Sequence, residues 1–548
     1  MNTVFYNAKI YISKGCFAEA LMITGGTITA VGSSADILKM TKDGDAKYDC
    51  HGRTIIPGLN DSHLHLMQYA ETLNQANIEN VSSIDELIDV CRRFIDEHPD
   101  KVSRGLHAIG WNQDNFADSS RLPDRHDLDK ISTDIPIVLE RVCGHIASAN
   151  TCLINSLELD KNSFRYSPGE VMRDESGFPT GIFRGGACVY IKEAVADFTI
   201  EEKRAILIDA MKKAASMGLT SLQSNDIGAD FDDTYEALAM LRDIYDKEEA
   251  AVRYHFQMCF ESPEAFSEFI SSDEFTGNLY SEDSWITPGP LKLYKDGSLG
   301  ARTALMKDGY LNDIENKGLR WLSCEEMDCY CSIAAKAGIQ VVTHAIGSQA
   351  IAETMASYRK AFIDGKNKLR HAIIHCQITD SELIEQIARD DFLVMAQPVF
   401  IDYDMNIAED LCGKDIISTS YAFGTLLRKG VHLSYGTDCP VETCNPFLNI
   451  YEAVTRKDRN GKPEAGFYPD EAVDVETAID AYTAESAYAQ LQENRKGRLK
   501  PGFYADLVIL DRDIFTIDPA EIKDIRPLLT MTGGRIVFSR DQELPFNL

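Results

Sequence analysis

The middle of the chain alternates short apolar runs with amphipathic stretches. The apolar runs have the length and the β-branched content of buried strands. Amphipathic stretches such as 201–217 and 324–337 have helical periodicity, and glycines such as Gly338 and Gly430 mark where two helices end. Repeated strand–helix units over this length favour an α/β fold, a (β/α)8 TIM-like barrel. The predicted strands are 219–223, 253–259, 291–294, 340–344, 372–375, 392–396 and 431–435.

The two ends of the chain have a different pattern. Segments 21–32 and 531–538 each read as two short strands joined by a Gly-Gly turn, and 505–511 reads as one more strand. Short strands at both termini predict a single small β unit that is completed by both ends of the chain. We therefore expect an N-terminal part over 1–56, a barrel domain over 57–490 and a C-terminal part over 491–548.

The segment from about 68 to 198 is too long for one strand-to-helix connection. It contains strand-like runs of its own at 106–111 and 135–140. We interpret it as an inserted subdomain, about residues 75–198, that follows the first barrel strand.

The composition limits which partners and which cellular location the sequence predicts. The chain has 548 residues, 44% of them apolar, which is enough for a large core. Its formal net charge of -31 argues against nucleic acid or an anionic membrane as a partner and is typical of a soluble surface. The first residues do not resemble a signal peptide, no run approaches a spanning helix, and the 14 cysteines are scattered. A cytoplasmic protein with reduced thiols is predicted.

Candidate chemistry begins with a histidine pair that follows a Pro-Gly turn. In an extended segment alternate side chains share a face, so His63 and His65 point to the same side. Two imidazoles in this arrangement can hold one transition metal, although an isolated pair is more often structural. Further polar residues fall at or near the ends of other predicted strands, where a barrel of this kind carries its active site. The full set is His63, His65, Lys292, His344, His375 and Asp438.

Lys292 is unusual because it lies inside an apolar strand. An unpaired buried ammonium is unfavourable, so this side chain needs a partner or a modification. Carbamylation by CO2 would turn it into an anionic oxygen ligand that can bridge two cations. The alternatives are a paired carboxylate or an amine that reaches solvent. Lys295 competes for the role, but it has the opposite parity in the strand.

With these residues in view, the chain resembles the amidohydrolase superfamily, in the branch called amidohydrolase family 3 or YtcJ-like. The resemblance covers nearly the whole chain in the right order. It rests on PGLNDSHLH (57–65), KLYKDGSLG (292–300), THAIG (343–347), IHCQ (374–377) and GTDCPV (436–441), with weaker matches at 110–112, 144–145, 179–181 and 504–507.

The resemblance implies a metal-dependent hydrolase with a urease-like β-sandwich beside the barrel. His63 and His65 match one pair of metal ligands, Lys292 a carboxylated bridge, and His344 and His375 the ligands of a second metal. Asp438 matches an aspartate that binds the first metal and moves protons. One or two zinc ions and a homodimer are also implied. The sequence departs from the family at Ile374, where a glutamate is common, which could alter the surroundings of the metal.

The function predicted from these residues is hydrolysis of a non-peptide, amide-like C–N bond in a small molecule. Water activated at the metal would attack, and Asp438 would act as general base and then general acid. Two alternatives stay open: ester hydrolysis on the same scaffold, and a binding or regulatory relative that lost turnover. The candidate substrate contacts, each of which packing could also explain, are Trp111, His145, Asp226, Ser298, Arg302 and Gln397.

Overall fold

Eight parallel strands form the central sheet, and they occur in it in chain order. The computed structural model describes residues 1–548 except 80, 100, 118–120, 142–145, 158–168, 197, 230, 232, 277–283, 541–543 and 545–548. Every pairing between neighbouring strands is parallel, as predicted for the barrel. The strands are β8 (Leu59–Leu64), β15 (Leu219–Ile227), β16 (Arg253–Met258), β17 (Ile286–Tyr294), β18 (Val341–Ala345), β19 (Ala372–His375), β20 (Leu393–Ala396) and β21 (Leu433–Tyr435).

The last strand approaches the first, so the barrel is nearly closed. The backbone N–H of Asp438 donates to the carbonyl of His63 (2.9 Å), and the N–H of His65 donates to the carbonyl of Cys439 (2.8 Å). The buried carboxylate of Asp61 adds to this seam, because it accepts hydrogen bonds from the N–H and the hydroxyl of Thr437. Two of the predicted metal ligands therefore lie on either side of the closing seam.

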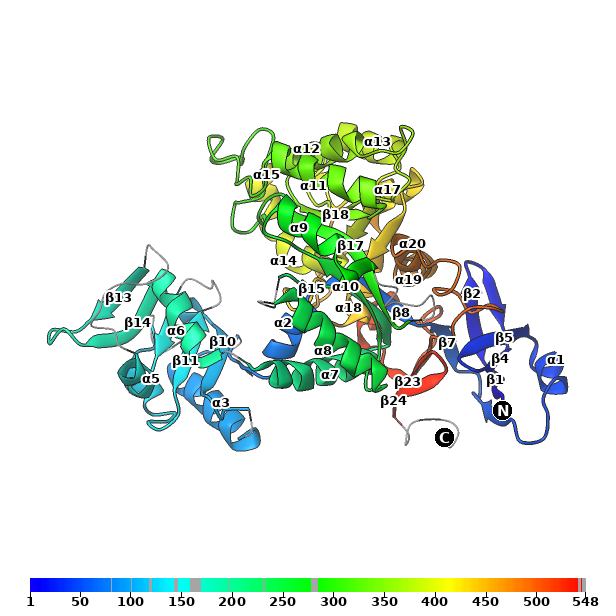
Figure 1. The fold of residues 1–548 in the computed structure, drawn as a ribbon, viewed down its shortest axis with the longest axis horizontal. Helices are drawn as coiled ribbons and strands as arrows, with labels where there is room; N and C mark the ends of the chain where they lie inside the picture. Colours follow the sequence, from blue (N-terminus) through cyan, green and yellow to red (C-terminus); the bar gives the residue numbers. More distant parts are fainter. Residues whose placement is uncertain are drawn as a thin grey trace. The chain divides into compact units, whose positions relative to one another are not determined.

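Helices between the strands surround the barrel (Figure 1). The predicted helix at 324–337 is α11 (Cys324–Ala337), which a Ser323–Glu326 capping box begins and Gly338, at φ 70°, ends. The predicted helix at 201–217 is α7 (Ile200–Ser216). The others include α8 (Thr234–Asp246), α9 (Pro263–Ile270), α12 (Ser348–Lys360), α13 (Ser381–Arg389), α14 (Ile401–Asp404), α17 (Phe423–Arg428), α18 (Pro446–Thr455), α19 (Val475–Ala481) and α20 (Ala484–Ala489).

Two further sheets contain the terminal strands. One of them joins both ends of the chain, because β7 (Thr54–Pro57) pairs antiparallel with β22 (Leu507–Leu510), with Ile56 opposite Val508. Apolar side chains of both sheets, among them Phe5, Ile55 and Leu507, share one buried cluster. The four-stranded sheet is β5 (Thr27–Gly32), β4 (Ala20–Thr24), β1 (Thr3–Tyr6) and β6 (Ala46–Asp49); the six-stranded sheet is β24 (Arg535–Ser539), β23 (Pro527–Thr532), β22 (Leu507–Leu510), β7 (Thr54–Pro57), β2 (Lys9–Ser13) and β3 (Cys16–Ala18).

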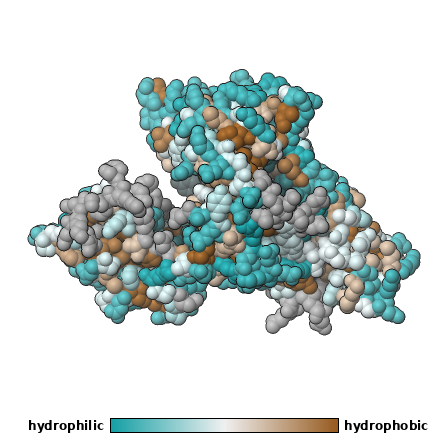
Figure 2. All heavy atoms as spheres, viewed as in Figure 1, coloured by the Kyte–Doolittle hydropathy of each residue, from teal (hydrophilic) through white to brown (hydrophobic). Residues whose placement is uncertain are grey.

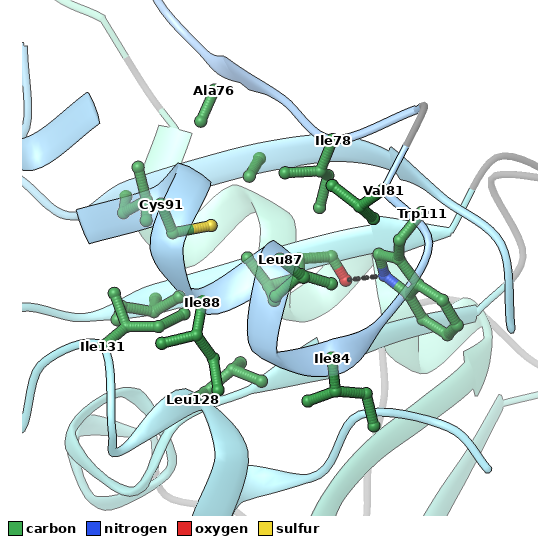
Figure 3. Packing of buried hydrophobic residues seen from close by; sticks show 14 of the residues in the cluster. Ala76, Ile78, Val81, Ile84, Leu87, Ile88, Cys91, Trp111, Leu128 and Ile131 are labelled. Carbon is green, nitrogen blue, oxygen red and sulfur yellow. Dashed lines mark hydrogen bonds between the residues drawn. The ribbon is translucent and has the colours of Figure 1, made fainter. Parts of the chain in front are cut away.

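Residues 68–207 form a separate compact unit with its own core, while 1–67 and 208–548 form the other. Helix α3 (Ile84–Glu97) buries Leu87 and Ile88 against Trp111 and its neighbours in the core of the smaller unit (Figure 3). The sheet of this unit has the order β13 (Gly169–Arg173), β14 (Pro179–Gly185), β12 (Ile146–Ala149), β11 (Ile137–Arg141), β10 (Leu106–Trp111) and β9 (Ala76–Asn77), and its other helices include α4 (Arg125–Leu128), α5 (Thr151–Ser156) and α6 (Gly186–Ala196).

Hydrophilic residues cover much of the face shown in Figure 2, with hydrophobic side chains scattered among them. This surface is consistent with the acidic composition. Within the described part of the chain, no helix combines the length and the apolar character needed to cross a membrane.

Candidate metal centre

The six predicted ligand residues come from five barrel strands and lie at the same end of the barrel. His63, Lys292, His344 and His375 belong to β8, β17, β18 and β19, while His65 and Asp438 follow β8 and β21. Parallel strands present their carboxyl ends on one face, which is why residues so far apart in sequence meet. The side chains interact electrostatically across the barrel: Asp438 and Lys292 each perturb the pKa of His63, His344 and His375.

The first group of donors is His63, His65 and Asp438, whose ligand atoms lie within 4.8 Å of one another. Nε2 of His63 and Nε2 of His65 are 3.3 and 3.4 Å from Oδ1 of Asp438. Burial lowers the pKa of His63 to about 3, so this imidazole is neutral and offers a lone pair. Burial raises the pKa of Asp438, but its contacts with both histidines outweigh burial and hold the pKa well below its usual range. Two imidazoles and a carboxylate are a donor set that suits a divalent transition metal.

The second group is His344 and His375, and the positions of the ring protons decide which of their nitrogens keep a lone pair. Nδ1 of His375 lies 2.8 Å from Oε1 of Gln397, whose amide NH2 donates to the Met395 carbonyl, so Nδ1 carries the proton. Nε2 of His344 lies 3.2 Å from the carbonyl of Gly297, so this nitrogen is also the protonated one. The remaining nitrogens, Nδ1 of His344 and Nε2 of His375, face each other at 2.9 Å.

Two lone pairs facing each other repel unless a cation lies between them. Burial lowers the pKa of His375 to about 4 and that of His344 well below its usual value, so a shared proton is disfavoured near neutral pH. A metal ion with nitrogen ligands would satisfy both imidazoles at once. The donors therefore fit a second cation beside the first.

The two lysines that the sequence offered as candidates for modification, Lys292 and Lys295, have different surroundings in the structure. Lys295 is fully buried and paired, with Nζ 2.9 Å from Glu353 and 2.7 Å from the carbonyl of Leu322. Lys292 is also fully buried, but its Nζ has no hydrogen-bond partner among the described residues and lies 3.5 Å from the centroid of the Tyr294 ring. Burial lowers the pKa of Lys292 to about 8, against the opposing charge of Asp438. Of the two lysines, only Lys292 has an amine left open to modification or to a ligand.

Sequence reasoning missed residues that hold these ligands in place. Nδ1 of His63 lies 2.9 Å from Oε1 of Gln257, whose NH2 donates to the Ser62 carbonyl, so Gln257 does for His63 what Gln397 does for His375. The signal for Gln257 was an amide between two large apolar residues, Phe256 and Met258, in a predicted strand. Asp61 accepts from the N–H of His63 at 3.1 Å, and its signal was a carboxylate inside the apolar segment before the histidine pair. Ile374 packs with Ala489 of α20 in a cluster separate from the ligands.

The predicted substrate contacts have different surroundings. Trp111 is fully buried in the core of the smaller unit, where its indole N–H donates to the Leu139 carbonyl, and this position favours packing (Figure 3). His145 lies outside the described residues. Asp226 is fully buried and accepts hydrogen bonds from Met67 N–H, Ser224 and Tyr254, so it supports the chain just after His65.

The remaining three predicted substrate contacts lie in different surroundings. Gln397 orients His375, as described above. Arg302 is exposed on the loop after β17. Ser298 lines a cavity of about 260 Å³ together with Phe400, whose ring stacks on that of His375 at 5.7 Å. This cavity adjoins the second group of ligands and is a candidate place for a substrate.

Comparison with known proteins shows the family and supports the fold. The model of the amidohydrolase family matches residues 47–538. YtcJ of Bacillus subtilis (strain 168), which its name assigns to the amidohydrolases, is 28% identical over 98% of this chain and 100% of its own length. The N-substituted formamide deformylase of Arthrobacter pascens is 23% identical over 97% of each chain. The crystal structure of an uncharacterized metal-dependent hydrolase from Pyrococcus furiosus has a TM-score of 0.76 and 25% identity, covering 94% of this chain and all of that one. The chain therefore belongs to the amidohydrolase family and is a metal-dependent hydrolase of the amidohydrolase superfamily.

Proposed function

We propose that this protein uses zinc to hydrolyse a non-peptide, amide-like C–N bond of a small molecule. The observation that carries the proposal is the carboxylate of Asp438, placed 3.3 and 3.4 Å from the Nε2 atoms of His63 and His65. An ionised carboxylate in contact with metal ligands can bind the cation and also accept a proton from water. The Arthrobacter relative, named for the deformylation of N-substituted formamides, supports an amide over other bonds.

The residues of this chain have distinct tasks in the proposed reaction. A bound zinc ion supplies Lewis acidity, which acidifies water and polarises a carbonyl group. Asp438 accepts the proton of the attacking water and delivers it to the leaving nitrogen, so that the amine departs neutral. Gln257 and Gln397 fix the tautomers of His63 and His375, which keeps the Nε2 lone pair of each ring available.

We further propose that Lys292 carries a carboxylate group. Its amine must be neutral to add to CO2, forming an N–C bond and losing a proton. The lowered pKa, about 8, leaves a sizeable neutral fraction near neutral pH. The resulting carbamate would be an anionic partner for cations held by both groups of histidines. This proposal predicts two metal ions for each chain and a lower metal content in Lys292→Ala.

The test is hydrolysis by the zinc-loaded protein, with N-formyl and N-acetyl amines beside the matched esters. Asp438→Asn should keep its fold and retain zinc but lose turnover by about 10²-fold or more, because the variant cannot accept the proton. Asp308→Asn, a change on the exposed loop after β17, is the matched control and should behave as the wild type. Metal content is measured on every variant by plasma mass spectrometry.

Three results would overturn this proposal. Unchanged turnover in Asp438→Asn would remove its role in proton transfer. Faster cleavage of esters than of amides would favour the ester hydrolase. A folded wild type that binds no zinc would identify a binding or regulatory relative.

A further inference from the structure

The cavity beside His375 has an unusual set of walls. Its lining comes from the segments that follow β17, β18, β19, β20 and β21, at the end of the barrel where the predicted ligands lie. One part of the wall is apolar and includes Phe400, Tyr403 and Val441. The other part includes the carboxyl groups of Asp404 and Glu442, and no lysine or arginine is among the described residues that line the cavity. The described lining therefore has two acidic groups and no basic one.

The two carboxyl groups are held in different ways. Asp404 accepts hydrogen bonds on Oδ2 from the amide of Gln377 (2.9 Å) and from the hydroxyl of Tyr421 (2.7 Å), both neutral donors. Glu442 lies 2.6 Å from the guanidinium of Arg459. Arg459 also contacts Asp402 at 3.1 Å, so one guanidinium serves two carboxylates. The cations around these groups do not balance their charge.

A third acid lies among the same residues. Glu452 is fully buried, and burial followed by the charges of Asp402 and Glu442 raises its pKa to about 10, so it is protonated at neutral pH. Burial also raises the pKa of Glu442, although Arg459 opposes the shift. Both shifts arise chiefly from burial, which disfavours the charged form, and a cation placed beside these groups would stabilise that form.

We propose that this cavity binds the protonated amine of the substrate, a primary ammonium carried by the group attached to the scissile amide. The ammonium would face Glu442 and Asp404, while the rings of Phe400 and Tyr403 would contact the alkyl chain and the face of the cation. The inference rests on the proposed amide hydrolysis, which it refines: the substrate is an N-acylated diamine rather than a neutral or an acidic amide.

The test compares three formamides of similar length that differ in the charge at the far end. They are N-formyl-1,5-diaminopentane, N-formylpentylamine and N-formyl-5-aminopentanoate. We expect kcat/KM of the zinc-loaded enzyme to be highest for the cationic compound, by about tenfold over the neutral one, as one charge-assisted contact supplies. The anionic compound should be the poorest of the three. A neutral or anionic compound that reacts as fast as the cationic one would overturn the assignment.

Two variants test whether the preference for the cationic substrate arises in this cavity. Glu442→Gln should reduce the ratio of cationic to neutral kcat/KM toward one and leave metal content at the wild-type level. Glu464→Gln removes the same charge from an exposed position outside the lining and should keep the wild-type ratio. An unchanged ratio in Glu442→Gln, or an equal change in both variants, would contradict the role of Glu442.

A binding measurement separates this inference from the proposed reaction. Calorimetry on the zinc-loaded protein compares pentylammonium with pentanoate, neither of which can be hydrolysed. Tighter binding of pentylammonium than of pentanoate, weakened in Glu442→Gln, would support the cavity assignment. This result would hold even if no formamide were cleaved, and then only the proposed reaction would be refuted. Equal binding of the two ions would overturn the cavity assignment while hydrolysis of neutral amides could still be measured.

Discussion

At the scale of single residues, two glutamines, Gln257 and Gln397, orient histidines of the candidate centre. Each accepts a hydrogen bond from Nδ1 of a histidine, and the second half of each amide donates to a backbone carbonyl, so that it cannot rotate freely. An imidazole fixed in this way has one tautomer and one direction for its lone pair. Such a partner of a metal ligand fixes the orientation of the ring and raises its basicity.

Replacing Gln397 by leucine should therefore weaken zinc binding without unfolding the protein. We expect the affinity to fall by about 10- to 100-fold, the usual effect of losing such a partner. Competition with a fluorescent chelator measures this affinity. Gln490→Leu is the control, because Gln490 is equally buried but accepts its hydrogen bond from Asn60, which is not a predicted ligand. Equal affinities in the two variants would refute the orienting role.

The six candidate ligand residues could be chosen from the sequence, but the residues that orient them could not. A ligand at a strand end can be recognised because its polarity interrupts an apolar run, as at Lys292 and His375. The partner of a ligand depends on which strands are neighbours and in which register, as for Gln257 of β16 and His63 of β8. Trp111 was predicted as a substrate contact from a family-like motif, and in the structure its ring is fully buried in the core of the smaller unit.

At the scale of elements, the strands were easier to predict than their ends. The apolar runs at 372–375 and 219–223 correspond to β19 and to the first part of β15. The predicted strand at 291–294 begins earlier in the structure, at Ile286, and its added part contains Pro288 and Pro290. The first part of β17 pairs with β16 through a shifted register. Such an irregular pairing accommodates prolines, which have no N–H to donate.

A buried lysine after the barrel links the C-terminal segment to strand β15. Lys496 is 5% exposed, and its ammonium donates to the hydroxyl of Ser221. Burial and the like charge of Arg253 lower its pKa to about 7, while Asp506 opposes them. The unfolded chain, with a pKa near 10.5, holds this proton more tightly than the folded chain. The free energy of unfolding should therefore increase as the pH rises from about 7 toward 10.

Lys496→Met should remove this dependence. In urea unfolding between pH 7 and pH 9.5, the wild type should gain stability with pH relative to the variant, and the difference between them should be largest near pH 7. Lys500→Met, a change at an exposed lysine of the same segment, should follow the wild type. Parallel curves for the wild type and Lys496→Met would show that the lysine keeps its ordinary pKa in the fold.

At the scale of the whole molecule, the two compact units have separate cores, and the tryptophans report on them separately. The chain has three tryptophans, and only Trp111 lies in the unit formed by 68–207. A protein with Trp285→Phe and Trp321→Phe therefore reports the unfolding of that unit by fluorescence.

In this background Leu87→Ala should destabilise the smaller unit by about 2–5 kcal/mol, because it removes a fully buried side chain from the cluster around Trp111. The Trp111 transition should move to lower denaturant, while zinc content stays unchanged. Asp89→Ala, on the exposed face of the same helix, is the control. A loss of zinc that accompanies the shift in Leu87→Ala would show that the two units unfold together.

The pairing of β7 with β22 has a consequence for how the protein is made. Ile56 and Val508 are neighbours in the sheet but are 452 residues apart in the chain (508 minus 56). At a synthesis rate of about 5–20 residues per second, the early strand waits roughly 20 to 90 s before its partner leaves the ribosome. During that time its edge is unpaired, and a nascent chain with an open edge can pair with another such chain. A cell that produces this protein quickly must shield that edge until translation ends.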